Sequence, residues 1–179
     1  MLTGNELGKW IDARLTRSAY RLELLDRYDA ASEREAFARF LRGEPSAAER
    51  RPWLARIRAE SEAGILNQRV HVLSTPLTDY LRFEATWGYA HNAAAGEDIR
   101  IIDLSERPAP AGLPGHDYWL IDDAHALVMH YDDAGRLIGA EPVGDAELPV
   151  YQRAREAAVA AAEPFAAWWA RHREEYRAA

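Results

Sequence analysis

The sequence predicts a single α+β domain spanning residues 1–179, with a mostly antiparallel sheet of five or six strands flanked by helices and a helix at the C-terminus. The chain has the length of one ordinary domain, and it holds no internal repeat and no low-complexity linker. Apolar residues recur at helical spacing in some segments and at strand spacing in others. Near the C-terminal end, three short strand patterns follow one another without an intervening helix, which is typical of an antiparallel meander.

The first four elements follow from apolar spacing and from helix start and stop signals. Residues 3–15 place apolar side chains three and four positions apart, which predicts a short helix. Residues 19–25 alternate between apolar and charged side chains, which predicts a strand. A capping box at residues 32–35 opens a helix that a glycine ends. The next helix starts at Pro52 or follows a short turn, because a second capping-box pattern at 46–49 conflicts with a proline one turn inside the helix.

The central segment, residues 69–104, reads as strand, helix and strand. Its first strand ends at Ser74. Thr75 and Pro76 then start a helix, because threonine caps helices well and proline fits the first helical position. Gly96 ends this helix, and an apolar strand follows.

The last third of the chain begins with a loop rich in proline and glycine, and long loops of this kind are often functional. The strands expected after it are residues 117–122, 126–131 and 136–141. An Asp-Asp-Ala-Gly turn joins the last two as a hairpin. A helix then starts at Asp145 or Leu148, and Pro164 breaks or kinks it ahead of an aromatic stripe over residues 165–176.

Composition limits the classes of function. The chain carries 22 Lys and Arg against 29 Asp and Glu, a net charge of −7, which argues against binding to duplex nucleic acid. It has no cysteine, which excludes disulfides, thiolate catalysis and cysteine-based metal sites. The N-terminus lacks the pattern of a secretion signal, and no apolar run approaches the roughly 20 residues that span a bilayer. We therefore expect a cytoplasmic protein without a membrane association.

Polar and aromatic side chains are concentrated in residues 69–104, and we expect a ligand or partner surface there. The candidates are Arg69, His71, Asp79, Tyr80, Arg82, Glu84, Trp87, His91 and Asn92. Two interpretations stay open. The aromatic residues of the helix can form a core stripe with His91 satisfied near the helix end. Alternatively, Glu84 and His91 line a cleft that holds an anion or performs acid–base chemistry.

No motif of known mechanism is complete, so the catalytic residues, if any, stay unassigned and we expect no cofactor. The phosphate-binding, dinucleotide-binding and nucleophile-elbow glycine patterns are all absent. Histidines and paired aspartates between Ile121 and Gly135 resemble metal ligands, but their spacing fits neither a calcium loop nor a zinc helix. Aspartate pairs are ordinary in turns. We therefore expect no metal site.

The chain resembles a family of small actinobacterial proteins that carry a domain of unknown function. The resemblance covers nearly the whole chain and rests on an ordered set of motifs. These are Glu33–Leu41 (EREAFARFL), Arg69–Ser74 (RVHVLS), Asp79–Glu84 (DYLRFE), Gly88–Asn92 (GYAHN), Gly96–Arg100 (GEDIR) and Asp117–Asp122 (DYWLID). It implies a gene position beside helix-turn-helix regulators and assigns no catalytic residues.

These observations together predict an accessory or regulatory protein of the cytosol that acts by binding. Its partner would be a protein, such as a helix-turn-helix regulator, or a small ligand. The alternative is a small enzyme acting on an anionic substrate such as a nucleotide or RNA. A homodimer built on the aromatic stripe of residues 165–176 is compatible with both.

Overall fold

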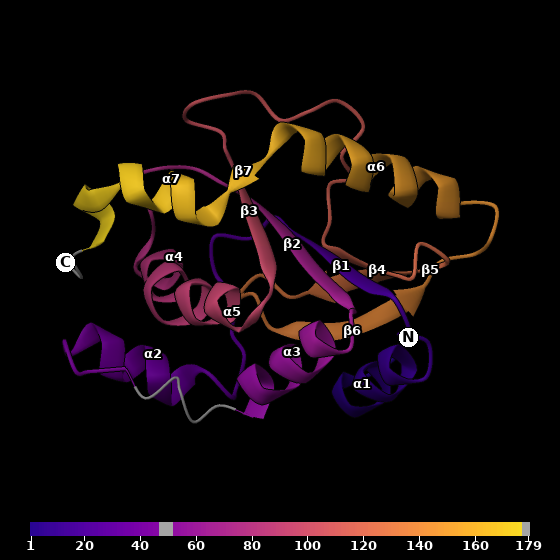
Figure 1. The fold of residues 1–179 in the computed structure, drawn as a ribbon, viewed down its shortest axis with the longest axis horizontal. Helices are drawn as coiled ribbons and strands as arrows, with labels where there is room; N and C mark the ends of the chain where they lie inside the picture. The colour runs from indigo at the N-terminus through magenta and orange to yellow at the C-terminus, as the bar shows by residue number, and fades with distance from the viewer. Residues whose placement is uncertain (47–51, 177–179) are drawn as a thin grey trace.

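A seven-stranded sheet in the order β6-β5-β4-β1-β2-β3-β7 forms the centre of the protein (Figure 1). The structure is a computed structural model that describes residues 1–46 and 52–176. The strands are β1 (Ser18–Glu23), β2 (Leu66–Leu73), β3 (Asp98–Asp103), β4 (Tyr118–Ile121), β5 (His125–Tyr131), β6 (Leu137–Pro142) and β7 (Glu163–Pro164). The α-helices are α1 (Gly4–Asp12), α2 (Arg34–Leu41), α3 (Pro52–Glu62), α4 (Asp79–Phe83), α5 (Ala90–Ala95), α6 (Leu148–Ala161) and α7 (Phe165–Arg171).

The prediction of a mostly antiparallel sheet with five or six strands is wrong, because the sheet is mixed. Strands β1, β2 and β3 are parallel neighbours, while the pairs β1–β4, β4–β5, β5–β6 and β3–β7 are antiparallel. Helices α2 and α3 connect β1 to β2, and a second helical crossover connects β2 to β3. A crossover of this kind makes the joined strands parallel. The short edge strand β7 has no counterpart in the prediction.

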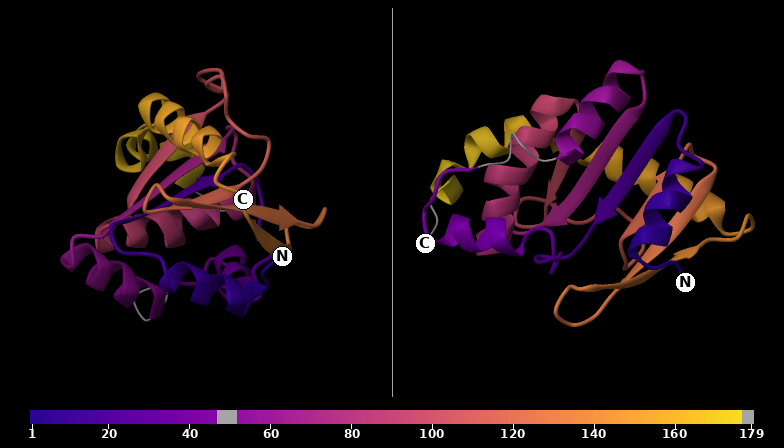
Figure 2. Two further views of the ribbon diagram at one scale, coloured as in Figure 1. Left: turned by 90° about the vertical axis from the view of Figure 1, so that its right-hand side faces the viewer. Right: turned by 90° about the horizontal axis from the view of Figure 1, so that it is seen from below.

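The two faces of the sheet are covered by different helices. Helix α6 packs on one face, over an apolar core that includes Leu22, Val70, Ile102 and Leu120. Helices α1, α2 and α3 and the helical segment from α4 to α5 lie on the other face, which Figure 2 (right) shows from the front. Within the described part of the chain, no helix is long and apolar enough to cross a membrane.

The helix predicted for residues 76–95 is present, with a later start and a change of winding. It begins at Asp79, where Thr78 rather than Thr75 caps it by accepting a hydrogen bond from the Leu81 N–H at 3.2 Å. Residues Glu84–Tyr89 are wound as a π-helix between α4 and α5. The predicted end at Gly96 is confirmed, since this residue has a φ of 113°. We call this continuous segment the 79–95 helix.

Other start and stop signals had mixed outcomes. The break at Pro164 is confirmed, because α6 ends at Ala161 and α7 begins at Phe165. The capping box at residues 32–35 is not formed at α2, which begins at Arg34 without a side-chain cap. Helix α3 starts at Pro52, and the second capping-box pattern lies largely on residues 47–51, outside the described part.

The predicted hairpin between β5 and β6 packs against the loop that follows β1. Gly135 in its turn has a φ of 79°, and a Cβ there would lie 2.4 Å from the carbonyl oxygen of Arg27. The Asp29 N–H donates to the Gly135 carbonyl at 2.9 Å. The turn and the loop are therefore in direct backbone contact.

Candidate functional site

One row of side chains crosses the sheet on the face opposite α6. In the register of the strands, Arg21 on β1 lies beside Arg69 on β2 and beside Trp119 on β4. Two residues further along, Glu23 lies beside His71. Because alternate residues of a strand point to the same face, these five side chains share a floor beneath α1, α2 and α3.

The charges of this floor are buried and paired. Arg69 is 7% exposed and Glu23 only 2%. The Nη1 of Arg69 donates to both Glu23 carboxylate oxygens at 2.9 and 3.0 Å, and its Nε donates to Glu97 at 2.8 Å. Arg21 Nε lies 3.0 Å from Glu23 Oε1, as an ion pair rather than an aligned hydrogen bond. Burial would raise the pKa of Glu23, but the guanidinium groups of Arg21 and Arg69 outweigh it and lower the pKa to about 2.

His71 is the most deeply buried of these five side chains and is fully covered. Its Nδ1 lies 2.6 Å from the Tyr89 hydroxyl, and its Nε2 lies 3.1 Å from the Leu25 carbonyl oxygen. The same hydroxyl donates to Glu23 at 2.8 Å. Burial lowers the pKa of His71. With both ring nitrogens engaged, His71 positions Glu23 and cannot reach a ligand above the floor.

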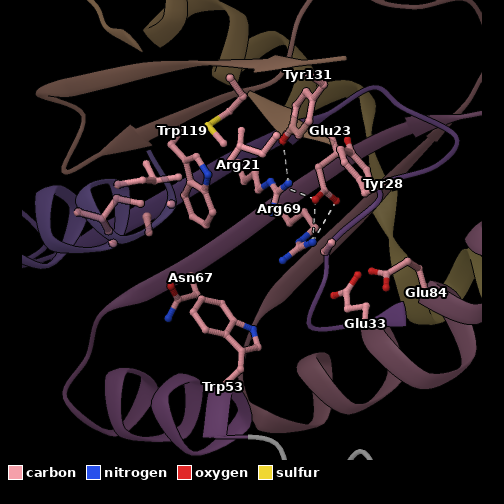
Figure 3. Close-up of a pocket in the computed structure, with 18 of the residues that line it drawn as sticks. Arg21, Glu23, Tyr28, Glu33, Trp53, Asn67, Arg69, Glu84, Trp119 and Tyr131 are labelled. Carbon is pink, nitrogen blue, oxygen red and sulfur yellow. Dashed lines mark hydrogen bonds and ion pairs between the residues drawn. The ribbon is translucent and has the colours of Figure 1, made fainter. Parts of the chain in front are cut away.

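A cleft of about 350 Å³ opens above the floor (Figure 3). Trp53 of α3 and Trp119 of β4 contribute indole rings to its lining, and Tyr131 of β5 contributes a phenol. An adjoining hollow extends toward Gly88 and Asn92. The two share the lining residues Arg21, Glu33, Trp53, Arg69, Glu84 and Trp119, so we treat them as one cleft.

Two carboxylates stand together on one side of the cleft. Figure 3 shows the side chains of Glu33 and Glu84 directed toward one another. The Tyr80 hydroxyl donates to Glu33 Oε2 at 2.9 Å. Burial raises the pKa of Tyr80, and the charges of Glu84 and Glu33 raise it further. Tyr80 therefore keeps its proton and donates a hydrogen bond to Glu33.

The π-helical winding brings Glu84 close to the backbone of its own helix. A Cβ at position 88 would lie 3.2 Å from Glu84 Oε2, so Gly88 leaves the space that this carboxylate occupies. Single π turns inside α-helices occur frequently at functional sites. The change of winding falls on the segment of the 79–95 helix that faces the cleft.

The structure brings part of the predicted site together. Arg69, Tyr80, Glu84 and Asn92 line the cleft, and His71 lies beneath it. Asn92 also donates to Glu97, the second partner of Arg69, at 2.8 Å.

The other predicted residues lie elsewhere. Arg82 pairs with Asp79 at 3.0 Å and with Glu175 at 3.0 Å, which fastens the C-terminal 3-10 helix Arg173–Tyr176 to α4. Trp87 packs in an aromatic cluster with residues of α2. His91 is half-buried and is not among the described residues that line the cleft.

Sequence reasoning missed the β1 half of the floor and both tryptophans. Arg21 and Glu23 alternate with apolar residues of β1, as Arg69 and His71 do on β2. The repeated pattern on two strands was the available signal. Trp119 lies beside Arg21 because β1 and β4 are neighbouring strands. The sequence pattern alone does not show that these two strands are neighbours.

Two of the aspartates that resemble metal ligands, Asp122 and Asp132, bind backbone N–H groups. Asp122 accepts hydrogen bonds from the N–H groups of Arg17 and Ser18, each at 2.8 Å, and from Thr16. Burial would raise the pKa of Asp122, but these hydrogen bonds lower it. Asp132 likewise accepts from two N–H groups of its own turn.

Comparison with protein families identifies the family of this chain. No curated protein matches the chain. The family described as a domain of unknown function (DUF6879) matches residues 5–170, which is most of the sequence. The chain therefore belongs to the DUF6879 family.

Proposed function

We propose that this protein acts by binding a small, flat molecule that is uncharged or cationic and carries N–H donors. The observation that supports this most is the convergence of two indole rings and two carboxylates around one cleft. The part of the cleft above the floor has a volume of about 350 Å³, which lies in the range of small-molecule sites. Such sites are mainly apolar, with a few fixed polar groups that orient the ligand.

The charges around the cleft favour this class of ligand over an anion. Arg21 and Arg69 already share Glu23, so an anion would compete with a buried carboxylate for them. It would also face Glu33 and Glu84 across the cleft. An N–H donor on the ligand would instead find carboxylate acceptors, and charge-assisted hydrogen bonds are the stronger kind. The alternative of an enzyme for nucleotides or RNA stays a prediction that this charge arrangement does not favour.

The aromatic residues supply a surface for a flat ligand. Trp53 is 39% exposed, although it is one of the largest apolar side chains. The guanidinium carbon of Arg21 lies 5.4 Å from the Trp119 ring centre, which holds this indole in place from one side. An aromatic ligand gains about 0.5–1.5 kcal/mol from a ring contact beyond the burial of its area.

We propose further that ligand binding has a regulatory role in the cytoplasm of an actinobacterium. The partner would be a protein such as a helix-turn-helix regulator. This part of the proposal is supported by the resemblance and by the acidic net charge of −7.

Three probes of matched shape test the ligand class: benzamidine, benzamide and benzoate. We expect ligand-observed NMR titrations of the full chain to rank benzamidine and benzamide above benzoate. Trp119→Ala should weaken the binding of benzamidine and benzamide about tenfold, through loss of a ring contact. Glu33→Gln should weaken the binding of benzamidine more than the binding of benzamide, because benzamidine is a cation and benzamide is neutral.

Glu35→Gln is the matched control for Glu33→Gln. Glu35 is exposed in the first turn of α2, two residues after Glu33, and it is not among the described residues that line the cleft. The control variant should leave all three affinities unchanged. Tightest binding of benzoate would replace our proposal with the anionic alternative. Binding that is insensitive to Trp119→Ala would show that the cleft is not the ligand site.

A further inference from the structure

We propose that Asp103, Glu106 and His172 form a binding site for one divalent transition metal ion, with zinc as the best fit. They come from the end of β3, the turn that follows it and the C-cap of α7. One possible ligand atom from each lies within 4.8 Å of the others. None of the three lines the cleft in the described part of the chain, so the two proposals are independent.

His172 is oriented as metal-binding histidines are. Its Nδ1 lies 2.8 Å from the Trp168 carbonyl oxygen, and its ring stacks on the Trp168 indole at a centroid distance of 4.5 Å. A hydrogen bond from one ring nitrogen to a carbonyl fixes the tautomer and leaves the other nitrogen to bind the metal. His172 is only 8% exposed.

The other nitrogen of His172 points at the two carboxylates. Nε2 lies 3.3 Å from Glu106 Oε1 and 3.8 Å from Asp103 Oδ2. It makes no hydrogen bond to any described residue. A histidine that is 8% exposed, with one ring nitrogen held by a carbonyl and the other facing two carboxylates, is an observation that a surface cluster of acids would not provide.

Asp103 needs a positive charge nearby. The residue is 1% exposed, and its oxygens accept hydrogen bonds from the Ser105 N–H at 2.9 Å and the Trp168 indole N–H at 3.2 Å. Among the described residues, no arginine or lysine pairs with it. A buried carboxylate is costly without a counter-charge. A metal ion held by Asp103, Glu106 and His172 would supply this counter-charge.

The distances suit zinc. Two ligand atoms at roughly 2.1 Å from a tetrahedral zinc ion lie about 3.4 Å apart. The separations of 3.3 and 3.8 Å around His172 Nε2 therefore need little adjustment. Imidazole with carboxylates is a donor set that zinc accepts. Because the Glu106 side chain is 27% exposed, water can take a fourth position.

The neighbouring charges allow a divalent cation. Arg171 donates to Glu106 at 2.9 and 3.2 Å and to Glu163 at 2.7 Å, and Arg107 lies 3.9 Å from Glu106. Three carboxylates and two guanidinium groups leave a local charge of −1 with His172 neutral. Arg171 keeps Glu163 as a partner if Glu106 turns to the metal.

The test is titration of the chelator-treated full chain with zinc chloride at pH 7 by calorimetry, together with visible absorption of the cobalt-loaded protein. We expect one equivalent of zinc per chain and a four-coordinate cobalt spectrum. His172→Gln should weaken zinc binding at least tenfold, since the loss of even an outer-shell partner costs about 10- to 100-fold. Glu106→Gln should act in the same direction while folding as wild type, because this residue is partly exposed.

The matched control is His130→Gln. His130 Nε2 lies 3.4 Å from Glu141 on a different part of the surface, so it is a second histidine–glutamate pair without a third ligand. Its loss should leave zinc affinity unchanged. Failure of the wild type to take up zinc would overturn the proposal. Equal weakening by His172→Gln and His130→Gln would overturn it as well. If His172→Gln does not fold, the zinc affinity of Glu106→Gln tests the proposal instead, and an unchanged affinity would overturn it.

Discussion

Glu23 and Asp117 are both buried carboxyl groups, yet their pKa values move in opposite directions. Burial raises the pKa of Asp117 to about 6, although its oxygens accept hydrogen bonds from Tyr28 and Leu24. Glu23 is as deeply buried, but Arg21 and Arg69 bring its pKa to about 2. Two adjacent guanidinium groups therefore outweigh the cost of burial, and two neutral hydrogen-bond donors do not.

Asp117→Asn should change how the free energy of unfolding depends on pH. The carboxyl titrates near 3.9 when unfolded and at about 6 when folded, so the native state binds more protons between these values. Its contribution to stability is therefore present below about pH 4 and is lost as the pH rises to 6. We expect urea denaturation to show the variant gaining about 2 to 3 kcal/mol relative to wild type over this range. Identical pH profiles would contradict the raised pKa.

At this scale the sequence predicted part of the site. Arg69 and Glu84 were identifiable because polar residues are dense around them. Arg21 and Glu23 were not, because charged residues that alternate along a strand usually face water. Here four helical segments cover that face as well, and this depends on the topology rather than on the strand itself.

Among the elements, the 79–95 helix was predictable in type but not in winding. Apolar spacing indicates a helix. It does not show whether the helix is wound as an α-helix or a π-helix, because that depends on how the segment packs in the folded protein. The aromatic residues of its buried side form the core cluster with α2 that the first interpretation expected. Glu84, on the π-wound part, lines the cleft, but His91, which the second interpretation placed there with it, is not among the described lining residues.

Gly88→Ala should weaken ligand binding while leaving the free energy of unfolding nearly unchanged. The new methyl would lie 3.2 Å from Glu84 Oε2, a tight contact that requires the carboxylate to shift slightly within the cleft wall. We expect weaker benzamidine binding in the NMR titration, with a change in unfolding free energy of no more than about 1 kcal/mol, because alanine favours helix over glycine. Gly115→Ala is the control, since a Cβ there has nothing within 4 Å. Unchanged benzamidine affinity would argue that Glu84 does not contact the ligand.

The order of the strands was beyond reach of the sequence pattern. The hairpin of β5 and β6 was predicted from its turn, since both strands and the loop are local. The parallel pairs β1–β2 and β2–β3 join segments separated by whole helices. The prediction of a mostly antiparallel sheet extended the pattern of the three consecutive C-terminal strands to the whole sheet, and it missed the parallel pairs for this reason.

At the scale of the whole molecule, the face of the sheet under α6 is apolar, whereas the opposite face combines the charged floor with apolar clusters that include Ile101 and Met129. Glu23 connects the parts of this opposite face. It joins β1 to β2 through Arg69 and to the 79–95 helix through Tyr89. Part of the aromatic stripe of residues 165–176 faces the interior, because Phe165 and Trp168 are buried in the protein's own core.

Trp169 and Tyr176 are the residues of this stripe that could contact a second copy of the chain. The homodimer stays a prediction.

Glu23→Gln should destabilise the entire domain. The lowered pKa means that the stabilisation is present above about pH 4.5 and is lost as the pH falls toward 2. The shift corresponds to about 3 kcal/mol, and removal of one partner from a buried ion pair typically costs about 3–5 kcal/mol. Urea denaturation at pH 7 measures this loss. The exposed Glu141→Gln serves as the control, with an expected effect below about 0.5 kcal/mol. A similar small effect for both variants would refute the role assigned to Glu23.

The close contact at Gly135 has a consequence for how sequences of this family can diverge. The loop that it touches carries Tyr28 and Glu33 to the cleft. Any side chain at position 135 would displace that loop, even though the turn lies about a hundred residues away along the chain. Surface hairpins normally tolerate substitution and insertion freely. In this fold the hairpin turn and residues 27–33 should instead vary together, so that a relative with a different turn is expected to have a differently shaped cleft.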